Sequence, residues 1–160
     1  MGRMYTVQFN GVAVTAQQDF LELIAPTDAV VILHDWELSQ STEMGDAAEE
    51  MLNIYVKRGA GTVTTGAGGS TPTPSPIEFG DVAFGGTTKV NNTTKMAAGT
   101  GSIQTLSAHA WNERVPFQKI YTPETRPIIS PGNRLTIELG TTPADSVTIN
   151  FTATFEEVGG

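Results

Sequence analysis

Apolar and polar residues alternate along several segments of the chain, with the period of two that predicts β-strands burying one face. The clearest alternations cover residues 5–14, 30–40, 52–57, 115–121, 135–139 and 147–156, and a weaker one covers residues 102–111. Groups of turn-forming residues separate these segments, and the helical period is almost absent. We therefore expect about eight or nine strands in an all-β fold, an antiparallel β-sandwich of the jelly-roll kind that forms one domain over residues 1–160.

Two positions in the first strands carry local predictions. Asn10 and Gly11 interrupt the alternation of residues 5–14 and predict a bend or a hairpin turn. Trp36 and His34 share the apolar face of residues 30–40, so Trp36 is expected in the core. His34 is expected to be a core histidine that donates a hydrogen bond to a backbone carbonyl, with a ligand or pH-sensing role as the alternative.

Two shorter segments lack the alternation. Asp46 follows a glycine and predicts the N-cap of a short helical piece over residues 47–51. Phe79, Val82 and Phe84 belong to an apolar turn segment, which is expected to plug one end of the core.

The longest interruption of the pattern covers residues 59–76, which read G-A-G-T-V-T-T-G-A-G-G-S-T-P-T-P-S-P and carry no charge. Its glycines free the backbone of the first part, and its alternate prolines favour an extended, stiff second part. Two interpretations stay open: a mobile surface loop, or an arm that orders against a neighbouring subunit at little desolvation cost. The candidate contact residues of this arm are Gly61, Thr65, Gly68, Ser70, Pro72 and Pro74.

The composition removes several classes of chemistry. The chain has no cysteine, which excludes disulfides, thiolate zinc sites, iron–sulfur clusters and cysteine nucleophiles. Charged residues make up only 16% of the chain, so the surface is expected to be rich in Thr, Ser, Asn and Gly. Neither a signal peptide nor a run of ~20 apolar residues is visible, and a soluble protein made in the cytoplasm is expected.

The net charge of −8 arises in the first third of the chain. No Lys or Arg stands between Arg3 and Lys57, a stretch that contains nine carboxylates. This distribution disfavours nucleic-acid backbones as partners, because phosphate binding requires clustered basic residues. The acidic region either keeps the molecule in solution or meets a basic protein surface. The candidate acidic contact face consists of Asp35, Glu37, Glu43, Asp46 and Glu49.

No catalytic, cofactor-binding or metal-ligating set stands out. His34 and His109 are the two histidines, and neither accompanies a nucleophile-elbow sequence such as G-x-S-x-G. The carboxylates of residues 43–50 lack the spacing of a calcium loop, and the Gly-rich loop lacks the Lys of a phosphate cradle. We therefore expect a protein that is not an enzyme and that uses no cofactor or metal.

Loop and turn motifs over most of the chain resemble those of a family of small, uncharacterised bacteriophage and prophage proteins. The motifs are Ser-Gln-Ser at 39–41, Gly-Asp-Ala at 45–47, Glu-Glu-Met at 49–51, residues 68–74, Asn-Asn-Thr-Thr at 91–94, Pro-Glu and Arg-Pro within 123–127, and Pro-Ala-Asp-Ser at 143–146. These motifs contain no catalytic set, so the resemblance implies a virion origin rather than an activity.

The resemblance implies a virion structural protein, and chiefly a capsid cement or decoration protein that stabilises contacts between capsomers. Such a protein is made in the host cytoplasm, lies on the capsid surface, and binds the major capsid protein and further copies of itself, with a trimer expected. Nucleic acid and membrane are not expected partners. The acidic face would then meet basic capsid residues, and the arm would reach a neighbour.

Two alternatives to the cement interpretation stay open. A tail-associated or fibre-associated module that binds a carbohydrate or the host would expose aromatic side chains, for which Trp111, Tyr121 and Tyr55 are the candidates. An enzyme with a hidden metal site is the third class.

Overall fold

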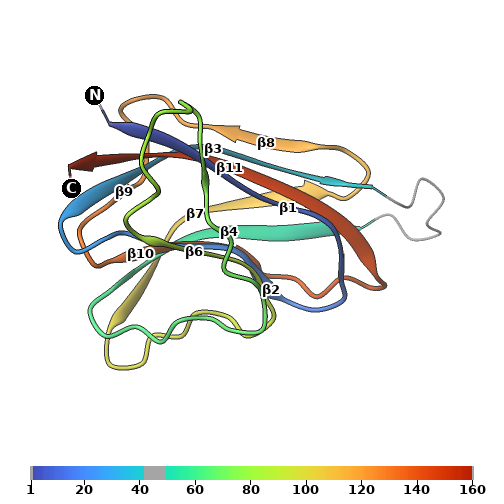
Figure 1. Ribbon diagram of the computed structural model, residues 1–160. Helices are drawn as coiled ribbons and strands as arrows, with labels where there is room; N and C mark the ends of the chain where they lie inside the picture. Colours follow the sequence, from blue (N-terminus) through green and yellow to red (C-terminus); the bar gives the residue numbers. More distant parts are fainter. Residues whose placement is uncertain (1, 42–49, 160) are drawn as a thin grey trace.

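The computed structural model describes residues 2–41 and 50–159, which form β-strands and their connections and contain no helix (Figure 1). The eleven strands are β1 (Arg3–Val14), β2 (Gln18–Ile24), β3 (Ala29–Gln40), β4 (Met51–Ala60), β5 (Ser75–Pro76), β6 (Thr87–Asn92), β7 (Ser102–Asn112), β8 (Phe117–Ile120), β9 (Ile128–Ile129), β10 (Arg134–Leu139) and β11 (Val147–Gly159). The all-β prediction is confirmed for these residues. Within them, no helix is long and apolar enough to cross a membrane.

The strands form two antiparallel sheets. Sheet A has the order β5-β1-β11-β3-β8, with β9 also pairing with β3, and sheet B has the order β6-β2-β10-β4-β7. Figure 1 shows the sheets as two layers, with both chain ends at the same end of the molecule. The predicted antiparallel β-sandwich is therefore confirmed. Most of the predicted helical piece, residues 47–49, lies outside the described residues, and Met51 begins β4.

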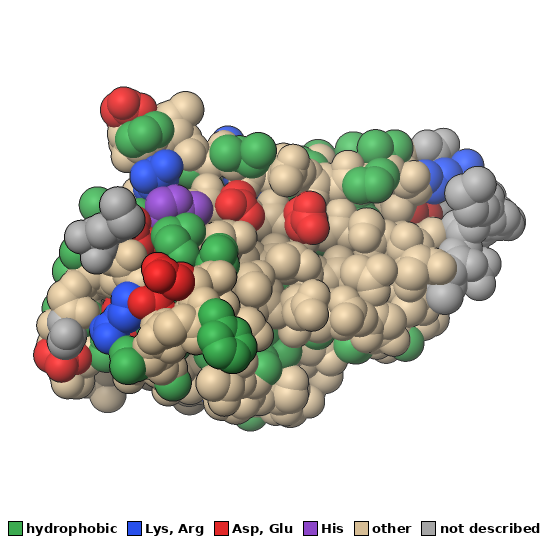
Figure 2. All heavy atoms as spheres, turned by 45° about the horizontal axis from the view of Figure 1, so that its top comes forward, with side chains coloured by type: hydrophobic (Ala, Val, Ile, Leu, Met, Phe, Trp, Pro, Cys, Tyr) green, Lys and Arg blue, Asp and Glu red, His purple; other side chains and the backbone are tan. Residues whose placement is uncertain are grey.

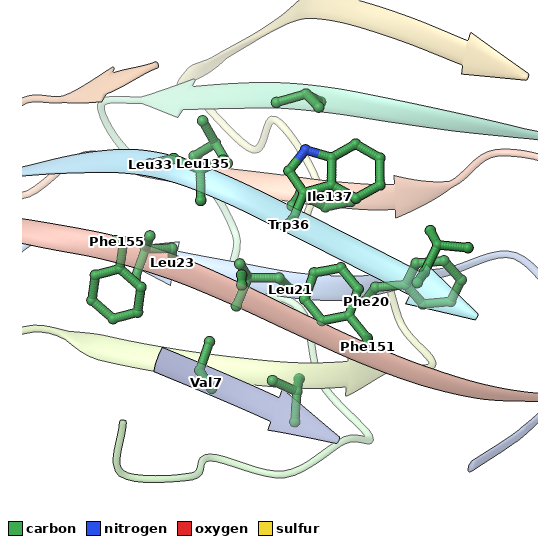
Figure 3. Packing of buried hydrophobic residues seen from close by; sticks show 14 of the residues in the cluster. Val7, Phe20, Leu21, Leu23, Leu33, Trp36, Leu135, Ile137, Phe151 and Phe155 are labelled. Atoms are coloured by element: carbon green, nitrogen blue, oxygen red, sulfur yellow. The ribbon is translucent and has the colours of Figure 1, made fainter. Parts of the chain in front are cut away.

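Aromatic and aliphatic side chains from both sheets fill the space between the layers. Figure 3 shows Phe20, Leu21 and Leu23 of β2 with Leu135 and Ile137 of β10 near Val7, Leu33, Trp36, Phe151 and Phe155 of sheet A. Phe151 stacks on Phe9 at a centroid distance of 5.6 Å, and Trp36 is fully buried, as predicted. Burying one such side chain stabilises the fold by about 1.5–3 kcal/mol relative to exposing it.

The pairing of β3 with β11 shifts by one residue at His34, which has no opposite residue in β11. A β-bulge of this kind moves the following side chains to the other face of the strand. Leu33 is therefore buried before the shift and Trp36 after it. The prediction that placed His34 on the core face is wrong. Its Nε2 atom instead lies 3.0 Å from Oε2 of Glu156, and both side chains are partly exposed.

A second bulge explains the Asn-Gly pair in β1. The pairing of β1 with β11 shifts between Phe9 and Val12, and Gly11 has a φ of 62°. Glycine tolerates this left-handed conformation, so the strand bends and continues to Val14 instead of reversing. The predicted bend is present, and the hairpin turn is not.

Candidate interaction surfaces

The segment of residues 59–76 lies along its own domain. Three of its residues exchange pairs of backbone hydrogen bonds with β6 and with the chain that follows β6. The N···O distances are 2.8–3.0 Å. The pairs are Thr64 with Ala97, Ala67 with Thr94, and Ser70 with Val90. Further on, Ser75 and Pro76 form β5 and pair with β1. The segment therefore runs from sheet B to the edge of sheet A, and we call it the strap.

Some of the predicted arm residues contact their own domain, and the others are exposed. Thr65 accepts a hydrogen bond from Arg134, the carbonyl of Pro72 accepts one from Thr88 Oγ1 at 2.6 Å, and Pro74 is buried. These three residues are engaged within the domain. The exposed members are Gly61, Gly68 and Ser70, so a contact with a neighbouring subunit stays a prediction for these positions only.

Two glycines of the strap allow its close approach to the neighbouring chain. A Cβ atom on Gly69 would overlap the carbonyl oxygens of Val90 and Asn91, and one on Gly66 would lie 2.8 Å from the carbonyl oxygen of Thr94. Backbone atoms leave little room to relax, so these positions exclude larger residues.

The strap covers a layer of buried charge on the outer face of sheet B. In β10, Leu135 and Ile137 point into the core, whereas Thr136 and Glu138 alternate with them and are nevertheless buried. On the same outer face, Glu138 accepts hydrogen bonds from Lys57 Nζ at 2.7 Å and from Lys95 Nζ at 3.1 Å. The alternation of polar and apolar residues in β10 is typical of a strand with one side facing solvent. The strap and the chain after β6 nevertheless cover that side.

Two carboxylates of β2 accept hydrogen bonds from the strap and from the chain after β6, the two segments that cover this face. Glu22 is fully buried and accepts hydrogen bonds from the backbone N–H of Gly66 at 2.9 Å and from Asn92 Nδ2 at 3.3 Å, and its other oxygen lies 3.3 Å from Arg134 Nη1. Asp19, also fully buried, accepts a hydrogen bond from the N–H of Met96 at 2.7 Å. Both belong to the acidic first third of the chain, yet neither is available to a partner.

Burial changes the acid–base properties of these carboxylates. Desolvation raises the pKa of Asp19 to about 7, although the hydrogen bond from Met96 acts in the opposite direction. Its Oδ1 atom has no hydrogen-bond partner among the described residues. Desolvation also raises the pKa of Glu22, and the N–H of Gly66 and the charge of Arg134 oppose that rise. Asp19 is therefore the less well compensated charge of the two.

Only part of the predicted acidic contact face can be placed. Asp35 and Glu37 lie on β3 beside β8, where Asp35 is partly exposed and Glu37 is exposed. Glu43, Asp46 and Glu49 lie outside the described residues. Figure 2, which brings the top of the Figure 1 view forward, shows a face made mostly of uncharged side chains with a few acidic ones.

The loop of residues 77–82 presents apolar side chains to solvent. Phe79 is 102% exposed, and Ile77 and Val82 are 59% and 61% exposed. Strand β1 holds both sides of this loop, because the N–H of Ile77 bonds to the carbonyl of Met4 and the hydroxyl of Tyr5 bonds to the carbonyl of Val82. The prediction that Phe79 and Val82 plug the core is wrong.

Phe84 alone fulfils that prediction. It is buried and packs on Phe155 at a centroid distance of 5.0 Å and on Tyr5 at 5.5 Å. The apolar loop is thus anchored in the core at its end and exposed at its tip.

At the opposite edge of the sandwich, an open groove of about 530 Å³ lies between β7 and the chain around β8 and β9. Its lining combines three basic side chains with apolar and hydroxyl groups and contains no carboxylate among the described residues. The lining residues are Arg58, Leu106, Ser107, Lys119, Tyr121, Thr125, Arg126, Pro127 and Ile128. Sequence reasoning missed this groove because its basic residues come from three separate segments.

A Ser–His pair borders the groove. His109 Nε2 lies 3.1 Å from Ser107 Oγ, and Trp36 Nε1 donates a hydrogen bond to the hydroxyl of Tyr121 at 3.3 Å. Burial, with a further effect from Lys119, lowers the pKa of His109. No carboxylate hydrogen-bonds to His109 within the described residues, and none of their His, Asp and Glu side chains form a group of three or more that could hold a metal ion.

Comparison with known proteins adds no relative: no protein-family model, no curated protein and no solved structure matches this chain.

The buried charge of Asp19 predicts a pH-dependent stability. Because burial raises its pKa from 3.8 to about 7, the folded state binds this proton more tightly than the unfolded chain, and the Asp19 contribution falls as pH rises across that interval. Asp19→Asn should raise the free energy of unfolding at pH 8 by about 2 kcal/mol and change it little near pH 4. Urea unfolding at both pH values measures this, with the exposed Asp28→Asn as control. Equal destabilisation at both pH values would contradict the assignment.

The docking of the strap predicts different effects of alanine at two glycines. Gly69→Ala should lower the free energy of unfolding by about 2 kcal/mol, because the new Cβ atom forces the strap away from β6. Gly80→Ala has open space around its Cβ position and should be nearly neutral. Thermal unfolding and limited proteolysis of residues 61–70 compare the two variants. A strap that extends away from the domain would leave both equally stable.

Proposed function

We propose that this protein is a bacteriophage virion structural protein, and specifically a capsid cement protein that stabilises contacts between capsomers. The observation that carries the proposal is the loop of residues 77–82, where a fully exposed Phe79 stands on a base held by β1. An ordered, exposed aromatic side chain is typical of a binding anchor. The phage origin rests on the resemblance of the loop motifs.

We also propose that the sandwich is a jelly roll. Omitting the two-residue strands and β6, the sheets have the orders β1-β11-β3-β8 and β2-β10-β4-β7. The chain passes from one sheet to the other in most of its connections, as two interlocked Greek keys require. In this description the strap and β6 are an insertion between β4 and β7, and small β domains of this architecture recur in viral capsids.

The mechanism of a cement protein is mass action. A subunit that binds only the assembled lattice stabilises it, and several contacts within one oligomer raise the overall affinity through effective concentration. Asp35 and Glu37 would face basic capsid residues. The buried carboxylates Asp19 and Glu22 would take no part in that contact, because their partners lie within the domain.

The carbohydrate-binding alternative receives less support. Trp111 and Tyr121 are only 2% and 7% exposed, and Tyr55 is partly buried with Lys57 Nζ 5.3 Å from its ring centroid. A sugar-binding platform requires aromatic faces that are open to the ligand. Phe79 is the exposed aromatic here, and it stands on a projecting loop rather than in a groove.

Mixing the protein with empty capsids of the encoding phage tests the proposal. Size-exclusion chromatography with light scattering should show co-migration with capsids, and binding should weaken as ionic strength rises. The double variant Asp35→Asn, Glu37→Gln should bind several-fold more weakly, whereas Glu124→Gln in an exposed turn should bind normally.

If the protein does not bind capsids at any salt concentration, the cement assignment is overturned. A tail or fibre module would then be the favoured function. Binding that is equally strong in high salt would overturn the electrostatic contact of Asp35 and Glu37 alone.

A further inference from the structure

The basic residues of the groove differ from most others in this acidic chain. Elsewhere, carboxylates neutralise Arg3, Lys57, Lys95 and Arg134. Within the groove, Arg58 bonds to the neutral Gln104, and Lys119 lies over the ring of Tyr121 at 5.3 Å from its centroid. The structure records no ion pair for these two, nor for Arg126, in the part of the chain that it describes.

The third basic residue carries a further sign of an absent partner. The Nε atom of Arg126 is buried and has no hydrogen-bond acceptor among the described residues. A carboxylate is the group that pairs best with guanidinium groups such as those of Arg58 and Arg126. The groove therefore favours an anionic ligand, and Leu106 and Ile128, 42% and 62% exposed, add an apolar contact.

The exposed loop of residues 77–82 has the complementary chemistry. It reads Ile-Glu-Phe-Gly-Asp-Val, so that two carboxylates flank the fully exposed Phe79. The N–H of Asp81 bonds to the carbonyl of Glu78 at 3.0 Å, which closes a turn with Phe79 near its tip. The loop thus combines an aromatic anchor with negative charge, which complements the positive charge of the groove.

The loop and the groove lie at opposite edges of the sandwich. The loop follows β5, at the β5–β1 edge of sheet A, whereas the groove lies beside β7 and β8, which end the two sheets on the other side. A contact between these sites within one copy is excluded by this separation, but two copies can meet edge to edge.

We infer that the loop of residues 77–82 of one copy docks into the groove of a second copy, with Phe79 against the apolar lining and Glu78 and Asp81 near Arg58, Lys119 and Arg126. The contact is heterologous, since a different surface of each copy takes part, and it closes into a ring if the rotation per copy allows. This inference deepens the proposed function by naming the self-association surface of the expected oligomer. Its test needs no capsid, so its failure is distinguishable from failure of the cement assignment.

Sedimentation velocity over a concentration series tests the contact with three full-length variants. Phe79→Ser removes the anchor, and Arg58→Glu with Lys119→Glu reverses two groove charges. Both should weaken self-association about tenfold or more. Met51→Ser, which removes an exposed apolar side chain from the start of β4, outside both the loop and the groove, should associate as the unchanged protein does. Association of the unchanged protein should weaken in high salt.

Mixing the two variants that are deficient in self-association tests the contact most directly. The Phe79→Ser protein keeps its groove and the Arg58→Glu, Lys119→Glu protein keeps its loop, so the mixture should form a 1:1 dimer and no larger species. A protein that is monomeric at all concentrations, or a mixture that forms no dimer, would overturn the inference. It would also be overturned if the groove variant self-associated normally but lost capsid binding, since the groove would then receive an acidic capsid segment.

Discussion

The structure depends on two carboxylates of β2, Asp19 and Glu22, which are fully buried where an unsatisfied carboxylate would be costly. Backbone N–H groups of Gly66 and Met96 meet them, and these donors belong to the strap and to the chain after β6. Because a buried carboxylate and its donor must stay together, the two connections are fixed to sheet B. An uncharged, glycine-rich segment thereby becomes an ordered part of the domain.

The fixed strap determines what the next segment can present. It delivers Ser75 and Pro76 to the edge of β1, and β1 then holds both sides of the following loop. Phe84 anchors the far end of that loop between Tyr5 and Phe155. The exposure of Phe79 is therefore maintained by an ordered scaffold. A rigid anchor loses little conformational entropy on binding, which suits an assembling protein.

The alternation of residue types was enough to predict the sandwich and the strands β1, β3, β4, β7, β8, β10 and β11, because the period of two is a local property. It did not mark β2, β5, β6 and β9, so the described residues form eleven strands where eight or nine were expected. The bulge at His34 was not predictable in this way, since one extra residue is visible only when β11 is paired with β3. The docking of the strap uses backbone donors, which leave no side-chain signature. Counting charges likewise could not show that Glu22 meets Arg134, which lies 112 residues further along the chain.

The candidate sites also depend on three-dimensional contacts that the sequence pattern does not reveal. Arg58, Lys119 and Arg126 come from β4, β8 and the turn before β9, and only the sandwich brings them to one groove. Phe79 was expected in the core because of its residue type, whereas a turn carries it outward. The residues of the strap could be singled out by composition, but their partners could not.

Amide hydrogen exchange followed by NMR tests the central claim, that the strap is a fixed part of the domain. The amides of Gly66 and Met96, which donate to Glu22 and Asp19, should exchange nearly as slowly as those of the buried strand β10, while the amide of Phe79 exchanges fast. If Gly66 and Met96 exchanged as fast as Phe79, the carboxylates would not hold the strap, and the ordered presentation of Phe79 would lose its physical basis.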